Sequence, residues 1–95
     1  MISEEIENYA DILKALGHPT RLSIVNGLCN HGCNVTHIVD TLDIPQATIS
    51  QHLSILRSHG IIKGQKKGLE VCYKVVNQKV QQIIIRKLLV NQRQV

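Results

Sequence analysis

The chain has 95 residues, 43% of them hydrophobic and only 2% aromatic, which suits a single domain over residues 1–95 with a modest core of Leu, Ile and Val. A net charge of +4 and a pI of about 9.2 suit an anionic partner, although solubility alone often explains such a bias. No secretory signal and no apolar run long enough to cross a bilayer are visible, so we expect a cytoplasmic protein with no membrane partner.

Helical periodicity fills the first half of the chain. Residues 3–16 carry an apolar stripe at helical spacing, and Gly17 ends this predicted helix. A second helix begins at Pro19, in "HPTRLSIVNGL", because proline is favoured in the first helical turn. The stretch "CNHGCN", residues 29–34, is rich in Gly and Asn and is predicted as a turn before a short third helix over 35–42.

The stretch "IPQATISQHLSILRSHGII" predicts a fourth helix. Pro45 preorganises its opening turn, and the helix runs to about His59 before Gly60 ends it. Its apolar residues Ile49, Leu53 and Leu56 recur at i, i+4 and i+7 and mark one buried face.

The pattern changes after the fourth helix. The sequence "IIKGQKKGLEVCYKVV" is rich in β-branched residues and predicts a hairpin whose tip holds Gly64, Lys66, Lys67 and Gly68. Asn77 is placed to cap a final helix over 78–91. The predicted fold is therefore mainly α with a small β-hairpin, a winged helix-turn-helix of five helices and a two-stranded wing.

The outward face of the fourth helix is polar but carries no charge, whereas a solvated helix face commonly carries Glu and Lys pairs. Amide and hydroxyl side chains of this kind can hydrogen-bond base edges in a major groove. Positive charge that attracts phosphate lies nearby. These cations are Arg57, Lys63, Lys66 and Lys67. Double-stranded DNA is therefore the expected partner, and a winged-helix protein-interaction module without DNA binding is the alternative.

The chain resembles the ArsR/SmtB family of bacterial repressors. The resemblance lies in "LKALGHPTRLSIVNGL", "ATISQHLSILRSHGII" and the wing "KGLEVCYKVV", and covers about residues 10 to 90. It implies a homodimer paired through the first and last helices, which blocks transcription at an imperfect palindrome until an inducer binds. No enzyme is expected, because the chain has no Gly-rich phosphate loop and no nucleophile–base pair with an orienting acid.

The family's DNA-facing residues transfer by position to the fourth helix. They fall on Gln46, Ala47, Thr48, Ser50 and Gln51, with His52 behind them. Pro45 stands where members often have Ser, so the resemblance leaves one phosphate or cap contact missing.

Three cysteines are the candidates for sensing an inducer. Cys29 ends the second helix, Cys33 precedes the third, and Cys72 is expected on the less buried face of the second wing strand. Three thiols suit a soft metal ion, two suit a disulfide or polysulfide bridge, and cysteine also fills cores for packing alone. No cofactor is required, and a repressor without cysteine-based sensing remains an alternative.

The metal sites that the resemblance implies elsewhere are missing from the sequence. The last helix, in "NQKVQQIIIRKLLVNQRQV", holds no His, Asp, Glu or Cys. The thiol positions of the soft-metal type are Asn34 and Thr36. His31 and His37 flank the cysteines and are weaker candidates for a metal site.

Overall fold

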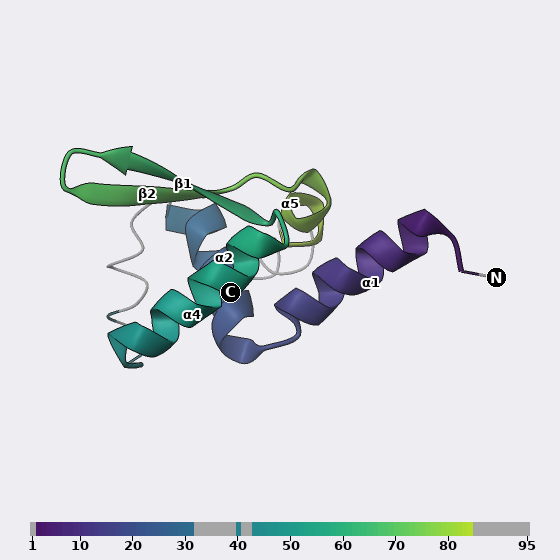
Figure 1. Cartoon of the computed structure of the whole chain (residues 1–95), viewed down its shortest axis with the longest axis horizontal. Coiled ribbons are helices and arrows are strands. Elements are labelled where there is room, and N and C mark those ends of the chain that lie inside the picture. Colours follow the sequence, from purple (N-terminus) through teal and green to yellow (C-terminus); the bar gives the residue numbers. More distant parts are fainter. Residues whose placement is uncertain (1, 32–39, 41–42, 85–95) are drawn as a thin grey trace, which may run out of the picture.

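The computed structural model describes residues 2–31, 40 and 43–84. Within these residues the chain forms helices around one two-stranded antiparallel sheet (Figure 1). The elements are α1 (Glu4–Leu16), α2 (Pro19–His31), α4 (Gln46–Ser58), β1 (Ile62–Lys67), β2 (Glu70–Val75) and α5 (Gln78–Ile84). The mainly helical fold with a hairpin is confirmed. The count of five helices is not, because the part of the chain described here forms four and the predicted third helix lies, apart from Asp40, outside it.

Helix α1 is capped by its own sequence. The Ser3 hydroxyl accepts a hydrogen bond from the Ile6 amide at 3.1 Å, which satisfies one of the free donors of the first turn. The helix buries one side, at Ile12 and its last turn, and its N-terminal half extends away from the other elements (Figure 1). The opposite side leaves Leu13 54% exposed.

Helix α2 forms the centre of the core. Its residues Ile24, Val25 and Leu28 are buried and belong to one cluster that also takes side chains from α1, α4 and α5. The prediction of a turn beginning at Cys29 is wrong, because the helix continues through His31. The reason is tertiary: Cys29 packs against the core, so burial favours a further helical turn over the local preference of the Asn residues.

Helix α4 follows the predicted pattern closely. Its apolar face is buried, with Ile49 and Leu56 fully inaccessible to solvent. Pro45 is the N-cap and offers no side-chain hydrogen bond, in agreement with the missing cap contact that the sequence predicted. The helix ends before Gly60, whose φ of 68° is a left-handed conformation that glycine adopts without strain.

The wing is a hairpin that pairs Ile62 with Val75 at its base and Lys67 with Glu70 near its tip. The turn lies at Gly68, with a φ of 63°, and at the fully exposed Leu69. Gly64 was expected at the tip, and this prediction is wrong.

Gly64 lies instead within strand β1, opposite Tyr73. A Cβ atom there would lie 3.0 Å from Cε1 of the Tyr73 ring, so the position has little room for a side chain. The glycine that looked like a turn residue is explained by the close approach of this ring.

Helix α5 begins at the predicted cap, where the Asn77 Oδ1 atom accepts a hydrogen bond from the Val80 amide at 3.1 Å. Val80 and Ile84 are buried in the common core, and residues 85–91 of the predicted helix lie outside the described part of the chain. Across residues 2–31, 40 and 43–84, no helix combines the length and apolar character needed to cross a bilayer.

We expect Ile24→Ala to lower the free energy of unfolding by about 2–5 kcal/mol, because it removes a fully buried side chain and leaves a cavity. Urea unfolding at one fixed protein concentration measures this loss. Leu69→Ala is the matched control and should change stability by less than about 0.5 kcal/mol, since Leu69 is fully exposed. Equal midpoints for the two variants would contradict the proposed core.

Candidate nucleic-acid interface

The predicted reading face of α4 is accessible in the structure. Gln46, Ala47, Ser50 and Gln51 are exposed and Thr48 is half-buried, while the opposite side of the helix packs into the core. The face therefore presents amides, hydroxyls and a methyl group, on a helix that its own apolar face holds in place.

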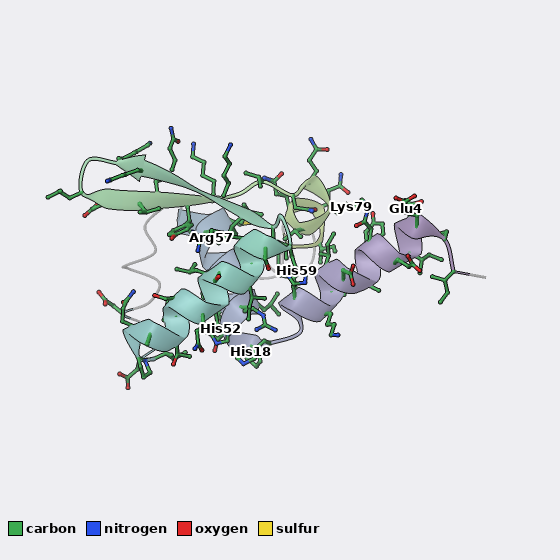
Figure 2. All side chains as sticks on the ribbon, in the orientation of Figure 1. Glu4, His18, His52, Arg57, His59 and Lys79 are labelled. Carbon is green, nitrogen blue, oxygen red and sulfur yellow. The ribbon has the colours of Figure 1, made fainter. Side chains whose placement is uncertain are left out.

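A groove with positively charged side chains lies where the last turn of α4 meets the wing. It is open, has a volume of about 480 Å³, and lies beside the last turn of α4, where Arg57 is placed (Figure 2). Its lining residues are Arg57, Ile62, Lys63, Gly64, Lys66, Val71 and Tyr73. Three cations in one groove next to the uncharged face match the expected division between base and phosphate contacts. Lys67 is also exposed but stands opposite Glu70 in the hairpin register.

His52 does not belong to the exposed face. Its side chain is only 9% exposed, and its ring packs against the ring of His18 with the centroids 4.5 Å apart (Figure 2). Arg21 donates from Nη1 to Nδ1 of His52 at 3.4 Å. The resemblance counted His52 with the DNA-binding residues, behind the outward ones. Its burial on the side of α4 that meets α2 agrees with the place behind them and does not support a contact with DNA.

Burial lowers the pKa of His52 below its ordinary value, and Coulombic interactions with His18 and Arg21 lower it further. The contact between His52 and Arg21 was not predicted from the sequence. The only local signal was the motif "HPTR", which places His18 directly before α2 and Arg21 on its first turn. Nothing in the local pattern indicated that this turn meets α4.

The cysteines differ in environment. Cys29 is a half-buried free thiol whose pKa is raised by burial. Cys72 is 5% exposed and disulfide-bonded, while its neighbour Val71 is 46% exposed. The prediction that Cys72 lies on the less buried face of β2 is therefore wrong, because this strand turns Cys72 inward and contacts α2. Cys33 lies outside the described residues.

No group of three or more His, Cys, Asp or Glu side chains suited to a metal ion occurs within residues 2–31, 40 and 43–84. The predicted ligand set of three cysteines is not gathered by this part of the chain, since one member falls outside it and another is disulfide-bonded. His31 lies in the last turn of α2, and His37 falls outside the described residues.

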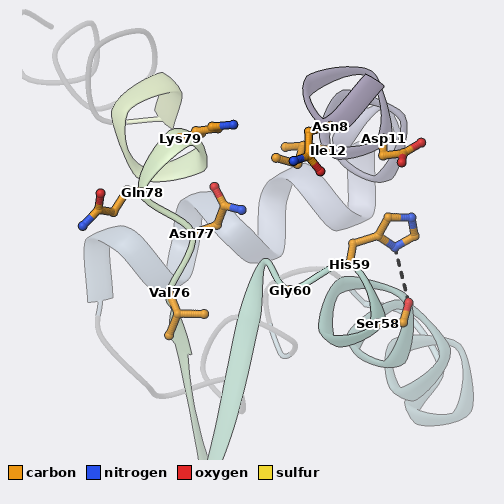
Figure 3. Close-up of a pocket in the computed structure, with 10 residues that line it drawn as sticks. All are labelled: Asn8, Asp11, Ile12, Ser58, His59, Gly60, Val76, Asn77, Gln78 and Lys79. Atoms are coloured by element: carbon orange, nitrogen blue, oxygen red, sulfur yellow. Dashed lines mark hydrogen bonds between the residues drawn. The ribbon is translucent and has the colours of Figure 1, made fainter. Parts of the chain in front are cut away.

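A second open pocket, of about 560 Å³, lies where α1 meets the end of α4 and the start of α5 (Figure 3). His59 lines it at the C-cap of α4, and its Nδ1 donates to the Ile55 carbonyl at 2.9 Å. The pocket's remaining lining residues are Asn8, Asp11, Ile12, Ser58, Gly60, Val76, Asn77, Gln78 and Lys79. The pocket is remote from the outward residues at the start of α4.

A helix laid across a helical core, followed directly by an antiparallel hairpin, defines a winged helix-turn-helix protein. Residues 18–63 match the family model described as bacterial regulatory protein, arsR family. The chain is 45% identical over 80 residues to the transcriptional repressor PagR of Bacillus anthracis, covering 83% of this chain and 80% of PagR. The chain belongs to the ArsR family, as its motifs predicted.

Solved structures agree with this assignment. The crystal structure of PagR has a TM-score of 0.75 at 44% identity and covers 84% of this chain and 92% of PagR. HlyU from Vibrio cholerae has a TM-score of 0.84 at 26% identity, covering 96% of this chain and 97% of HlyU. The homodimeric winged helix-turn-helix domain of Mb0332 from Mycobacterium bovis has a TM-score of 0.76, covering 95% of this chain and 83% of that domain. At 22% identity this last likeness shows the fold alone.

We expect Cys29 to react slowly with iodoacetamide at about pH 7.5, because its raised pKa keeps the thiol protonated and the thiolate is the nucleophile. The rate should rise as the pH approaches 9 or higher. Mass spectrometry of the peptide that holds Cys29 measures the rate, with the denatured chain as the control. Equal rates for the folded and denatured chains at about pH 7.5 would contradict the burial of this thiol.

Proposed function

We propose that this protein is a sequence-specific DNA-binding transcriptional repressor and that α4 enters a major groove of its operator. The observation that carries the proposal is the accessible, uncharged outer face of α4 above a fully buried inner face. The similarity to PagR, a transcriptional repressor, supports it. The alternative is a protein-interaction module that has the same fold and no affinity for DNA.

The residues of the α4 face have distinct roles in this proposal. The side-chain amides of Gln46 and Gln51 can pair bidentately with adenine, while Thr48 and Ser50 reach bases or phosphates. The small Ala47 lets the backbone approach and contacts a thymine methyl group. His52 supports the helix from behind and makes no DNA contact, in keeping with its burial.

The wing supplies affinity for the phosphate backbone. Arg57, Lys63 and Lys66 line the groove between α4 and β1, and Lys67 extends the positive charge toward the tip. Each lysine or arginine that neutralises a phosphate releases condensed counterions, so these contacts make binding salt-dependent without reading sequence. The hairpin tip would follow the sugar-phosphate backbone or the adjacent minor groove.

A homodimer delivers two α4 helices to one operator in this proposal. Helix α1 leaves Ile6 and Leu13 more than half exposed, two turns apart on one side, and this unpartnered stripe suits a second copy of the chain. The Mb0332 domain, which shares this fold, is homodimeric. Half-sites would then lie about one helical turn apart, roughly 34 Å, in an imperfect palindrome.

The double variant Lys66→Glu/Lys67→Glu should weaken binding to every duplex to a similar degree, because these side chains contact phosphates rather than bases. The slope of log affinity against log salt should become shallower by about one unit for each phosphate that is no longer neutralised. Fluorescence anisotropy over a salt series measures both quantities, with a selected duplex and an unrelated duplex in parallel.

Gln51→Ala is the matched comparison for the wing variant. It should lower affinity for the selected duplex by about 1–3 kcal/mol and leave affinity for the unrelated duplex and the salt slope nearly unchanged. Unchanged affinity and slope in the double lysine variant would overturn the role of the wing. Absence of any duplex binding by the unmodified protein would favour the protein-interaction alternative.

We further propose that a thiol reaction at Cys72, with Cys33 as its partner, controls release from DNA. Cys72 is buried in the strand that pairs with β1, and β1 in turn contacts α4. Oxidation of two thiols to a disulfide gives two protons and two electrons to an oxidant such as peroxide, which is reduced to water. A change at Cys72 therefore acts on the wing and the recognition helix together.

A soft metal ion held by Cys29, Cys33 and Cys72 is a second candidate inducer. The disulfide reaction and the metal ion would both act at Cys72 on β2. The elevated pKa of Cys29 favours the two-cysteine reaction, because a metal ligand must be a thiolate. A repressor without cysteine-based control is the remaining alternative, and the following experiment separates it from the other two.

Peroxide treatment of the reduced protein should change its affinity for DNA by roughly tenfold, within the usual range of coupling energies between sites. Cys72→Ser should abolish this response, and Cys29→Ser, the matched control, should retain it. Anisotropy titrations before and after treatment give the result, and mass spectrometry identifies the bond formed. An equal response in the wild type and Cys72→Ser would exclude the thiol mechanism, and a response to Cd(II) alone would favour the metal.

A further inference from the structure

A partly buried polar contact connects the three helices that place the proposed DNA-binding face. Arg21 of α2 donates from Nε to the carbonyl oxygen of Ala15 in α1, at 2.5 Å. The same guanidinium donates from Nη1 to Nδ1 of His52 in α4, at 3.4 Å. One side chain therefore connects the end of α1, the start of α2 and the middle of α4.

His18 completes this cluster from the turn between α1 and α2. Its ring lies 4.5 Å from the ring of His52, tilted by 46°. Its Nδ1 accepts a hydrogen bond from the Thr20 amide at 3.1 Å, which caps the first turn of α2. We call His18, Arg21 and His52 the histidine–arginine joint.

The hydrogen bonds of the histidine–arginine joint require both imidazoles to be neutral. A guanidinium and a backbone amide can only donate, so Nδ1 of His52 and Nδ1 of His18 must each supply a lone pair. Each ring then carries its proton on Nε2. A second proton would occupy Nδ1, remove the acceptor and add a positive charge beside Arg21.

The charges around His52 oppose its protonation. Within the described residues, the titratable or charged groups that act on it are His18, from the turn before α2, and Arg21, from α2. On its own helix the positions one turn away, such as Thr48 and Leu56, are uncharged, and α1 contributes the Ala15 carbonyl through Arg21. Protonation would thus place a positive charge on a ring that is only 9% exposed and in contact with the Arg21 guanidinium.

The sign of the effect follows from linkage. The pKa of His52 is lowered in the folded protein relative to its ordinary value of 6.5, so the unfolded chain binds more protons at acidic pH. The stabilising contribution of the neutral ring is fully present above that ordinary value. It is lost as the pH falls through the lowered value in the folded protein.

We propose that the histidine–arginine joint is a proton-sensitive positioning device that holds α4 against α1 and α2 and loosens it on acidification. The inference rests on the proposed function only in assigning DNA recognition to α4. It predicts that acidification weakens DNA binding. A histidine exposed at the interface would give the opposite sign, because added positive charge strengthens binding to a polyanion.

The test measures duplex affinity between about pH 7.5 and pH 5.5, at constant ionic strength, for the wild type, His18→Asn and His52→Asn. Asparagine offers an acceptor near the position of Nδ1 and does not titrate in this range. The wild type should lose roughly tenfold in affinity on acidification, within the usual range of coupling energies between sites. His52→Asn should reduce this change to about twofold or less, with a smaller reduction in His18→Asn.

His59→Asn is the matched control, because His59 is exposed on the same helix and bonds only locally. It should keep the full pH response of the wild type. A wild-type affinity that is constant or rises on acidification would overturn the proposal, as would an unchanged pH response in His52→Asn.

A second measurement keeps the inference testable if an Asn variant fails to fold or if the wild type binds no DNA. NMR titration of the wild-type imidazoles should show His52 titrating together with the backbone amides of α4, below the ordinary range. Amides of α4 that stay unchanged while His52 titrates would overturn the proposed device. Absence of DNA binding at about pH 7.5 with this coupled titration intact would instead count against the proposed function alone.

Discussion

The packing of α4 on α2 is the constraint on which the rest of the molecule depends. Ile49, Leu53 and Leu56 are buried in one cluster with side chains of α2, and this fixes which side of α4 faces outward. The buried side of α4 is apolar apart from His52, so the polar side chains on the other side are not needed to pack the helix into the core. The uncharged outer face is thus a consequence of which residues the core takes.

Two further contacts act on the same helix. The wing strand β1 contacts α4 directly, so this contact fixes the position of the hairpin relative to the outer face of α4. The histidine–arginine joint links α4 to the ends of α1 and α2 through hydrogen bonds that require neutral imidazoles. Cys72 lies on β2, next to this assembly rather than within the α4 face. A reaction at the Cys72 thiol would therefore act on α4 through the wing, whereas protonation of the imidazoles would act on α4 through the histidine–arginine joint.

Local signals predicted most of the fold. The apolar periodicity of α4, the cap at Asn77 and the helix end at Gly60 each depend on residues close by in the sequence. The structure confirms all three. The misplaced features depend on distant contacts. Gly64 is required by the ring of Tyr73 across the hairpin, and Cys72 is buried because its strand meets α2.

The candidate site also combines features that the local sequence predicted with one that depends on a distant contact. The exposed residues of the α4 face were predicted from helical spacing and family resemblance, and each of Gln46, Ala47, Ser50 and Gln51 is accessible. The burial of His52 was not predicted, because it depends on Arg21, which is 31 positions earlier in the chain.

The most direct test of the central claim is an NMR titration of the labelled protein with a duplex selected from a random pool. The account predicts large shifts in the side-chain amides of Gln46 and Gln51, and shifts confined to α1 or α5 with these amides unchanged would contradict it.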